Sequence, residues 1–545
     1  MNILRTIAVL GTLAGCVGAG YAADVADATA IPSARELEAQ GAVIGAIYID
    51  AQNIFDLNDA RENTGLYRFG NALHVTTREH VIRHQLLFRT GDRFMQHTLD
   101  ESERILRSAR YLYDASVRPV AWHDGKVDVL VTTHDVWTLN PGISFGRHGG
   151  TNTYGFELEE LNILGTGTSI AASHKSGIDR SSDTLEFRDQ HLFDTWASLA
   201  LTYSNNSDGS TKGFSLERPF YSLDTSWSAG AHFLDDDRVE SLYDGGRIID
   251  QFQQHARRAS ISGGWSSGLV DGWTHRWTTG LSYDETRFDT SPYWSGPTTI
   301  PQDRKFVYPW MGIELVQDDF TKTRNRDQIG RTEDFQLGMH FSAHLGWADR
   351  SFGSDRDAAI FDAAAGYGFN PGAESTLLFS TGSSGRLEDG SFTNTVLNGA
   401  VRYYLQQSDR RLFFITAQGM KGYRLDRDNQ ILLGGDNGLR GYPLRYQAGD
   451  ASALLTMEER YFTNWYPFRL FRIGAAAFFD VGRTWGGVDP DAPGRGLLRD
   501  IGIGLRIGNT RSGLGNMIHV DLAFPLDGDS SISNVQLIVE TKQKF

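Results

Sequence analysis

The sequence predicts two parts, a small α+β domain over residues 42–135 and an all-β barrel over residues 139–545 that crosses a membrane with antiparallel strands. Helical and strand periodicities mix in the first part. In the second part, apolar and polar residues alternate again and again, as in FQLGMHFSAHL (Phe335–Leu345). Alternation over ~9–11 residues is typical of strands that face lipid on one side and water on the other.

The composition is compatible with this interpretation and excludes some partners. The formal net charge of −15 argues against a nucleic-acid partner. Beyond the N-terminus, no apolar run approaches the ~20 residues of a transmembrane helix. A soluble β-sandwich or propeller is the alternative, but strands of membrane-crossing length and the terminal Phe545 favour the barrel. The polar stretches Ser204–Gly213 and Asp235–Arg247 suit turns and external loops.

The first 22 residues read as a secretory signal peptide. Arg5 forms a short basic region, an apolar run follows, and Ala22 is placed for cleavage before Ala23. The segment Leu13–Cys16 (LAGC) also fits a lipoprotein box, in which Cys16, the only cysteine, would carry lipid. Residues 23–41 form a short segment before the first domain.

The domain at 42–135 has the predicted order β-α-α-β-β. An apolar run at Ala42–Ala51 predicts the first strand, and HDG (His123–Gly125) predicts the turn between the last two. Capping boxes predict where both helices begin. Pro119 predicts that the first strand of the final pair lies at a sheet edge. The capping pairs are Thr76 with Glu79 and Thr98 with Glu101, and the final strands are Ser116–Trp122 and Lys126–Thr133.

Signals that resemble catalytic or metal sites lack the context that such sites need. Gly142–Gly146 and Gly264–Gly268 match G-x-S-x-G, yet both sit in alternating β sequence rather than in a strand–turn–helix. His80 and His84 have helical i, i+4 spacing without an evident third ligand. The acidic run Asp235–Asp237 reads as a solvated loop, with a cation or lipopolysaccharide contact as the alternative. We therefore expect no enzyme, no cofactor and no metal.

Several segments resemble a known family. The 42–135 unit looks like a POTRA domain. LLGGDNGLRGYPLR (Leu432–Arg445), Glu458–Pro467, Ala476–Trp485 and Ile501–Gly508 are similar, in this order, to the surface-antigen barrel of the BamA/TamA family. The family barrel has sixteen antiparallel strands, and residues 139–545 are long enough to supply them.

The resemblance implies a set of site residues. In the family, the arginine of an R-G-Y loop folds back into the lumen and pairs with the aspartate of an F-x-D-x-G strand. Carried over, Arg440 pairs with Asp480, with Glu459 as an additional neighbour, and glycines allow the loop a backbone with positive φ near the wall. The loop motif is Gly434, Gly435, Arg440, Gly441 and Tyr442, the strand motif is Phe479, Asp480 and Gly482, and the C-terminal assembly signal is Val539 and Phe545.

The resemblance also implies a location and a role. We expect a multi-pass barrel in a Gram-negative outer membrane, in contact with lipid and lipopolysaccharide, with the POTRA domain in the periplasm. It would assist the insertion or translocation of unfolded or β-rich outer-membrane or secreted client proteins, with periplasmic accessory proteins as further partners. A dedicated two-partner-type exporter and a passive channel or structural protein are the alternatives. The seam between the first and last strands, near Ile143–Arg147 and Val535–Phe545, would part for the client.

The mature protein is expected to begin at Ala23 or, if lipidated, at Cys16. Mass spectrometry of the purified membrane-inserted protein distinguishes the two starts, because only the second yields a diacylglyceryl-modified peptide. Retention of residues 1–22 in that form would contradict both.

Overall fold

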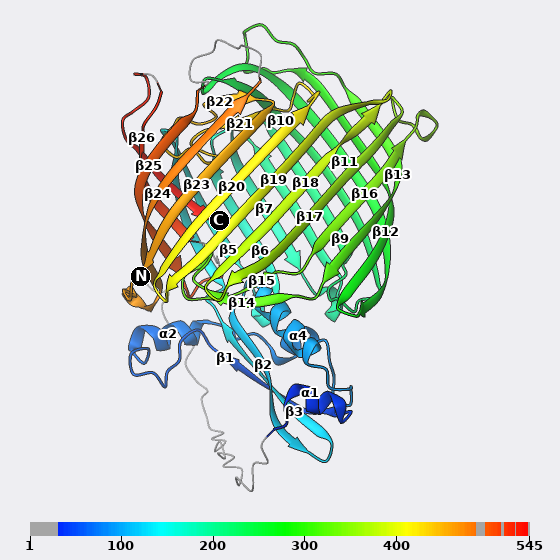
Figure 1. Cartoon of the computed structure of the whole chain (residues 1–545), viewed down its shortest axis with the longest axis vertical. Coiled ribbons are helices and arrows are strands. Elements are labelled where there is room, and N and C mark those ends of the chain that lie inside the picture. The colour runs from blue at the N-terminus through cyan, green and yellow to red at the C-terminus, as the bar shows by residue number, and fades with distance from the viewer. Residues whose placement is uncertain (1–30, 487–495, 514–516, 529, 543–545) are drawn as a thin grey trace, which may run out of the picture.

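The computed structural model describes residues 31–486, 496–513, 517–528 and 530–542. The predicted signal peptide, Cys16 and Phe545 lie outside these ranges. In the described part, a closed antiparallel barrel of twenty strands carries a small α/β domain at one end (Figure 1). We call this end the domain side and the opposite end the distal side. No helix in these ranges is long and apolar enough to cross a membrane.

The N-terminal domain is a three-stranded sheet covered by helices. The sheet order is β1-β3-β2, with β1 parallel and β2 antiparallel to the central β3. Val127, Val129 and Val131 project from one face of β3 into the apolar core, where Leu106 joins them. The elements are α1 (Ala34–Ala39), β1 (Val43–Gln52), α2 (Gly65–Leu73), α3 (Glu79–His84), α4 (Gln96–Ser108), β2 (Leu112–His123) and β3 (Lys126–Asp135).

The domain differs from the predicted β-α-α-β-β order. Three described helices, not two, separate β1 from β2, so the POTRA assignment is not supported by the element order. Both predicted capping boxes are wrong, because Arg78 and Met95 precede α3 and α4. The first turn of α4 is capped from another element, since the backbone N–H of Gln96 donates to Glu38 at 2.8 Å. The predicted edge position of the strand with Pro119 is confirmed by the sheet order.

The barrel strands run in order around the ring and close between the last and the first. They are β4 (Leu139–His148), β5 (Thr151–Glu160), β6 (Thr168–Ser176), β7 (Ser181–Asp189), β8 (Ser198–Asn206), β9 (Gly209–Arg218), β10 (Trp227–Asp244), β11 (Arg247–Val270), β12 (Trp273–Thr290), β13 (Arg304–Gln317), β16 (His340–Ala348), β17 (Ala358–Gly372), β18 (Ser375–Glu388), β19 (Ser391–Ser408), β20 (Arg411–Tyr423), β23 (Ala451–Phe462), β24 (Phe471–Trp485), β25 (Leu498–Asn509), β26 (Met517–Pro525) and β27 (Gln536–Lys542). Short 3-10 turns lie at η1 (Ile163–Gly165), η2 (Leu192–Asp194), η3 (Arg350–Phe352) and η4 (Pro467–Arg469).

The expectation of sixteen strands is therefore wrong. Polar stretches that the sequence assigned to loops are strands that pair with their neighbours. Ser204–Gly213 belongs to the β8–β9 hairpin, and residues 235–244 complete β10, which pairs with β11 along its whole length. Phe335–Leu345 is also not one strand, because β15 ends at Gln336 and β16 begins at His340. Hydrogen bonding to a neighbouring strand, which polar residues permit, extends these hairpins.

The alternation of side chains gives the barrel two different faces. On β25, Ile501, Ile503 and Leu505 are exposed on the outside, whereas Asp500 and Arg506 are buried on the lumen side. Exposed apolar side chains of this kind recur on neighbouring strands around the barrel. An outer apolar belt with a polar interior is the arrangement of a transmembrane β-barrel.

The longest domain-side connection, residues 318–339, folds into a hairpin under the barrel. Strands β14 (Phe320–Arg324) and β15 (Thr332–Gln336) pair antiparallel (Figure 1). Near their turn, Ile329 packs with Tyr404 and Phe414 of the barrel wall. Arg107 of α4 holds β15 through a bidentate pair with Asp334 at 2.6 and 2.8 Å. The hairpin thus contacts both helix α4 of the N-terminal domain and the lumen side of the barrel wall.

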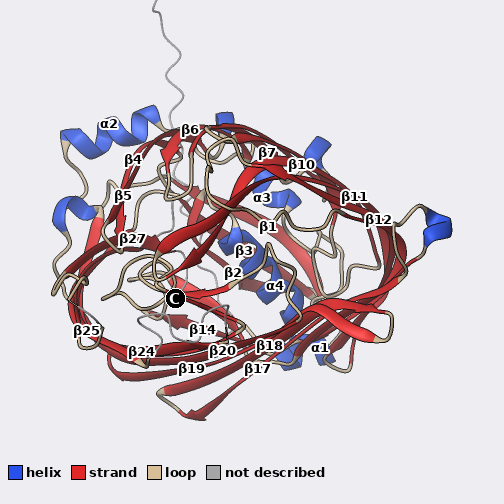
Figure 2. Ribbon diagram, turned by 90° about the horizontal axis from the view of Figure 1, so that it is seen from above, coloured by secondary structure: helices blue, strands red, loops and turns tan. Residues whose placement is uncertain are grey.

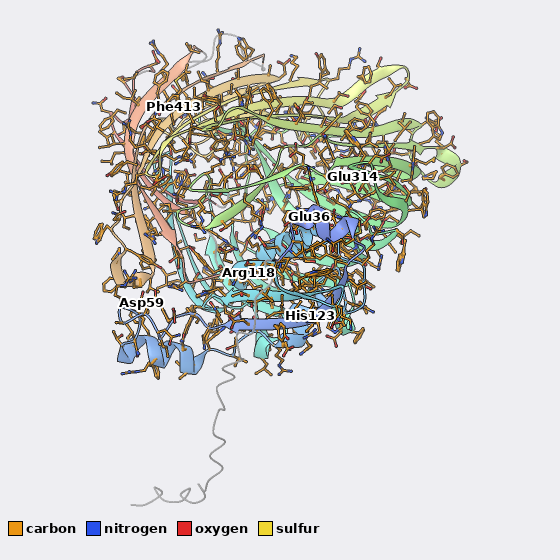
Figure 3. All side chains as sticks on the ribbon, turned by 60° about the horizontal axis from the view of Figure 1, so that its bottom comes forward. Glu36, Asp59, Arg118, His123, Glu314 and Phe413 are labelled. Carbon is orange, nitrogen blue, oxygen red and sulfur yellow. The ribbon has the colours of Figure 1, made fainter. Side chains whose placement is uncertain are left out.

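Other domain-side connections also contact the domain. Glu101 accepts a hydrogen bond from the backbone N–H of Leu223 at 2.9 Å, in the β9–β10 connection. Glu62 pairs with Arg511 of the β25–β26 connection at 2.6 Å. Figure 3 brings this end forward and shows Asp59, just before α2, well apart from Arg118 and His123 of β2. The domain therefore covers the domain-side opening through polar contacts around its rim.

The packing of the β14–β15 hairpin is expected to weaken as pH rises. Burial, reinforced by the carboxylate of Asp327, raises the pKa of Glu333 from 4.5 to about 7, although backbone N–H groups of Arg326 and Asp327 favour its charged form. An opened hairpin returns this pKa toward 4.5. Between the two values the packed form holds a proton that the open form lacks, so stability falls across this window.

Hydrogen exchange of the hairpin amides, corrected for intrinsic rates and measured below and above this window, checks this expectation. Protection in the natural protein should fall with rising pH, and Glu333→Gln should remove the dependence. The same pH dependence in both proteins would contradict it.

Candidate functional site

The distal connection between β20 and β23, residues 424–450, turns inward and enters the lumen. Its two short strands, β21 (Ile431–Leu433) and β22 (Gln447–Gly449), pair antiparallel. Between them, Leu439 and Tyr442 are fully buried, in an apolar cluster with Leu454 of β23. We call residues 424–450 the inward loop.

Arg440 lies at the deepest point of the inward loop, inside a cage of carboxylates. Its Nε and Nη2 donate to the two carboxylate oxygens of Asp480 at 2.8 and 3.0 Å. Its Nη1 donates to Glu458 at 3.2 Å and to Asp521 at 3.0 Å. The ring of Phe478 stacks under the guanidinium, 3.3 Å from its carbon to the ring centroid. A planar, always charged guanidinium fits this bidentate and stacked geometry, which a lysine could not reproduce.

A second layer of arginines balances the charge of the cage. Arg506 donates to Glu458 at 2.9 Å and also pairs with Asp521, and Arg460 donates to Glu458 at 2.7 Å. Asp480 and Asp500 are cross-strand partners on β24 and β25, so two carboxylates stand side by side on the wall. Because the arginines and their carboxylate partners are withdrawn from water, each of these charges is stabilised by the other, whereas Asp500 accepts from the Gly441 N–H.

The glycines of the loop motif provide space rather than an unusual backbone. A Cβ on Gly434 would lie 2.5 Å from the nitrogen of Arg445, and one on Gly435 would lie 2.4 Å from the oxygen of Tyr442. At Gly441 a Cβ would meet that of Asp500 at 2.6 Å, and the Gly441 N–H donates to Asp500 at 3.1 Å. None of these three has a positive φ, whereas Gly438 of the same loop has a φ of 122°, so the expected reason holds for Gly438 and is wrong for the other three.

Two further motif residues secure the loop against the wall. The hydroxyl of Tyr442 donates to the carbonyl of Arg499 at 2.7 Å and accepts from the backbone N–H of Arg499 at 3.1 Å. A Cβ on Gly482 would meet Leu433 of the loop at 2.9 Å. The aromatic side chain and the missing side chain both serve the close packing of the loop on β24 and β25.

Two sequence-predicted residues point away from the cage. Glu459 faces the outside and pairs with Arg411 at 2.7 Å, so the acidic neighbour of Arg440 is Glu458. The side chain of Phe479 points to the outer face of β24, whereas that of Asp480 points to the lumen. Phe478 supplies the ring under Arg440. Successive strand residues alternate between faces, so a one-residue error in the assignment reverses the side. Arg506 and Asp521 were missed, although their inward positions follow from the same alternation.

The barrel closes weakly next to this site. Val539, predicted as part of an assembly signal, lies opposite Arg147 of β4, and this is the only register pair between β27 and β4 in the described residues. By contrast, β4 and β5 pair from Leu139–Glu160 to His148–Thr151. Phe545 falls outside the described residues. We call the β27–β4 junction the seam.

The inward loop also contacts the other side of the seam. A Cβ on Gly149, in the β4–β5 turn, would lie 2.2 Å from the nitrogen of Leu444, which shows how closely loop and turn approach. Arg445 forms a bidentate pair with Asp179 of the β6–β7 connection, at 2.7 Å for both bonds.

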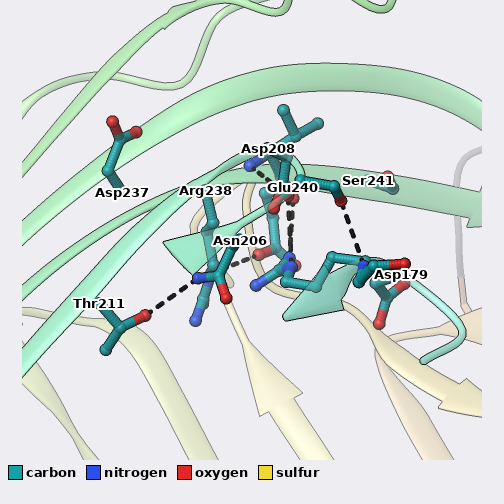
Figure 4. Close-up of polar contacts among 12 residues, drawn as sticks. Asp179, Asn206, Asp208, Thr211, Asp237, Arg238, Glu240 and Ser241 are labelled. Atoms are coloured by element: carbon teal, nitrogen blue, oxygen red, sulfur yellow. Dashed lines mark hydrogen bonds and ion pairs between the residues drawn. The ribbon is translucent and has the colours of Figure 1, made fainter. Parts of the chain in front are cut away.

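The distal rim near Asp179 is itself held by a polar network. Figure 4 shows Asp179 and Asp208 near Glu240 of β10. Arg180, the neighbour of Asp179, pairs with Asp208 at 3.2 Å, and Asp208 accepts from the backbone N–H of Val239 at 3.0 Å. The inward loop is therefore anchored to a rim that is itself cross-linked.

One group of potential metal ligands adjoins the cage. His519, Asp521 and Glu540 offer ligand atoms within 4.8 Å of one another. Asp521, however, already accepts from Arg440 and pairs with Arg506. Two guanidinium groups at the same carboxylate oppose a cation by repulsion, so the arrangement serves the ion network better than a metal.

Comparison with known proteins gives distant structural neighbours. No protein-family model matches the chain, and no curated protein matches its sequence. BamA from Haemophilus ducreyi lacking POTRA domains 1–3 is 12% identical, over 91% of this chain and 85% of that one, with a TM-score of 0.36. CdiB from Acinetobacter baumannii is 12% identical over 92% and 73%, with a TM-score of 0.43. CdiB from Escherichia coli is 12% identical over 92% and 76%, with a TM-score of 0.46. At these identities and scores the likeness does not extend to an activity.

Arg440→Ala and Asp480→Ala are each expected to destabilise the barrel by about 3–5 kcal/mol, because each leaves the other charge buried. The double variant should lose less than the sum, since the two residues share one interaction. Denaturant unfolding in lipid vesicles and heat-modifiability on gels measure the effects.

The exposed pair Arg499–Asp527, with a distance of 2.8 Å, is the matched control. Alanine variants of that pair should cost about 1 kcal/mol or less. Strict additivity at Arg440 and Asp480 would show that their contact does not contribute to stability.

Proposed function

We propose that this chain lies in a Gram-negative outer membrane, with its N-terminal domain in the periplasm, and assists the insertion or passage of other polypeptides. The apolar belt of the barrel and the predicted signal peptide support the location. A client polypeptide would approach from the domain side, where polar side chains around the rim contact the N-terminal domain.

The seam is the observation that carries the proposed activity. Strands β27 and β4 share the single register pair Val539–Arg147 in the described residues, so most of the facing backbone N–H and carbonyl groups are not used between these strands. Unpaired strand edges bind other strands. A β-rich client can therefore add to either edge through main-chain hydrogen bonds.

The inward loop would control this seam. Arg440 fixes it to β23, β24 and β26 on one side, and Arg445 fixes it to the β6–β7 connection on the other. Separation of β27 from β4 pulls these anchors apart unless one set of contacts gives way. The loop thus connects the two sides of the seam through side-chain contacts, where the backbone strands share a single register pair in the described residues.

Segments pack into the lumen from both ends in the described residues, which disfavours a wide passive channel. The inward loop packs inside the distal end, and the β14–β15 hairpin with the N-terminal domain lies at the other. We propose no enzymatic activity, because the arginines of the cage and the three carboxylates that contact Arg440 are engaged in ion pairs. Insertion of many clients and export of one dedicated client remain the two forms of the proposal.

Depletion of the protein, followed by quantitative proteomics of the outer membrane and the culture medium, tests the function. Loss of many barrel proteins would indicate an insertase, and loss of one secreted protein would indicate an exporter. Unchanged proteomes would exclude both.

A disulfide across the seam is expected to abolish function reversibly. Arg147 and Val539 are opposite one another in antiparallel strands, a spacing of about 4.5–5.5 Å between Cα atoms that suits a disulfide. Arg147→Cys with Val539→Cys, in a Cys16→Ser background, should fail to sustain the client proteins until reductant is added.

The matched control is Ala343→Cys with Ala363→Cys, a register pair between β16 and β17 far from the seam. This pair should form a disulfide without loss of function. A seam-locked protein, verified as cross-linked, that sustains client levels as well as this control would eliminate lateral opening as the mechanism.

A further inference from the structure

Helix α2 turns its apolar face away from the protein. Leu66, Phe69 and Leu73 follow helical spacing on one face and are 69%, 62% and 59% exposed, and no residue of the helix is buried. In a helix packed on a water-soluble domain, the apolar stripe faces the core. The reversed orientation of α2 requires apolar surroundings outside the chain.

The orientation of α2 is fixed by the opposite face. Tyr67 packs on Phe55 with 4.6 Å between ring centroids. Asn71 donates to the backbone carbonyl of Phe55 at 2.8 Å and accepts from its N–H at 3.1 Å. Gly70 faces Phe55 and Trp137. Rotation of the helix to bury its leucines would break all of these contacts, so the apolar exposure is built into the domain.

Both ends of the α2 region are tied to the barrel rim on either side of the seam. The Tyr67 hydroxyl donates to the carbonyl of Phe468 at 3.1 Å, in the β23–β24 turn. Beyond the helix, the N–H of Arg78 donates to the carbonyl of Gly165 at 3.1 Å, in the β5–β6 turn. Figure 2 shows α2 outside the ring of strands, beside β4 and β5. Figure 1 places α2 just below the domain-side rim, so the helix lies outside the ring at the end of the wall, where the edge of a membrane leaflet would meet the barrel.

The rim turns mark the level of this leaflet. Leu164, Phe193 and Phe468 are 63%, 88% and 73% exposed, and each adopts a left-handed backbone with φ of 52°, 54° and 54°. This conformation is uncommon for residues other than glycine. Its repetition at three turns, each time with a large apolar side chain pointing outward, indicates that these side chains meet the interface between lipid and water. Two of the three turns are those that hold α2.

We propose that α2 is an interfacial helix whose Leu66–Phe69–Leu73 face inserts into the domain-side lipid leaflet beneath the seam. The face would contact lipid at the boundary between acyl chains and headgroups, because it continues the apolar belt of the barrel. Arg68 is exposed on the same helix but does not belong to this face, and its guanidinium donates to Asn63 at 3.1 Å. The inference rests on the proposed membrane location. It adds that the domain is held to the lipid as well as to the barrel, close to the weakest junction of the wall.

Fluorescence quenching in proteoliposomes of the full-length protein tests the insertion. An environment-sensitive label is attached to Leu66→Cys, Phe69→Cys or Leu73→Cys in a Cys16→Ser background. Lipids with a nitroxide near the headgroup or near the end of the acyl chain serve as quenchers. Arg68→Cys is the matched control on the same helix, and Leu281→Cys, exposed on β12, reports the barrel belt. Gel heat-modifiability confirms that each variant folds.

The expected result is at least severalfold stronger quenching at the three apolar positions than at Arg68→Cys, with the shallow nitroxide more effective than the deep one. Quenching at Leu281→Cys but not on α2 would overturn this inference alone and would show that a second copy or a client protein covers the face. Absence of quenching at Leu281→Cys would instead overturn the membrane location.

Discussion

The guanidinium of Arg440, held among Asp480, Glu458 and Asp521, decides how the inward loop and the barrel wall fit together. The three carboxylates come from β23, β24 and β26. Glu458 and Asp521 also pair with Arg506 of the wall. Asp480 is therefore the carboxylate that depends most on the cation from the loop. The loop in turn would bury an unpaired arginine if the wall were different. The loop thus supplies the positive charge and the wall supplies the negative charges that stabilise each other. This ion pairing positions the glycines and Tyr442 for their close contacts with the wall.

From this contact the loop reaches across the seam. The wall next to the cage ends at β27, whose backbone joins β4 at Val539 and Arg147, and the loop continues to Gly149 and Asp179 on the far side. Side-chain contacts of the loop therefore do what the backbone ladder does elsewhere in the barrel. A junction held by side chains can be released by moving one segment, whereas a full ladder opens only by breaking many hydrogen bonds together.

Local pattern was sufficient for some features and insufficient for others. Period-2 alternation predicted a barrel with one lipid-facing side, and the motifs of the resembling family named the two residues that meet in the cage, Arg440 and Asp480. Strand number could not be predicted, because it depends on which polar segments find a neighbour to pair with. The start of α4 was misplaced because Glu38 of another element caps it. Helix α2 was missed, since its apolar residues contribute nothing to a core.

The two ends of the barrel are closed by ion pairs that differ in their exposure to water. On the distal side, charges with almost no exposure form the cage, and breaking such a pair costs about 3–5 kcal/mol. On the domain side the ion pairs are of two kinds. Arg107–Asp334 is 4% and 17% exposed and Glu62–Arg511 is 6% and 13% exposed. His97–Asp224 is 24% and 54% exposed, and exposed pairs contribute about 0–1 kcal/mol each. The exposed domain-side pairs therefore break more readily than the pairs of the cage, whereas the buried domain-side pairs do not differ from the cage in this respect. Under the proposed function, a client that arrives at the domain side meets these exposed pairs first, while the buried cage holds the inward loop in the distal end of the lumen.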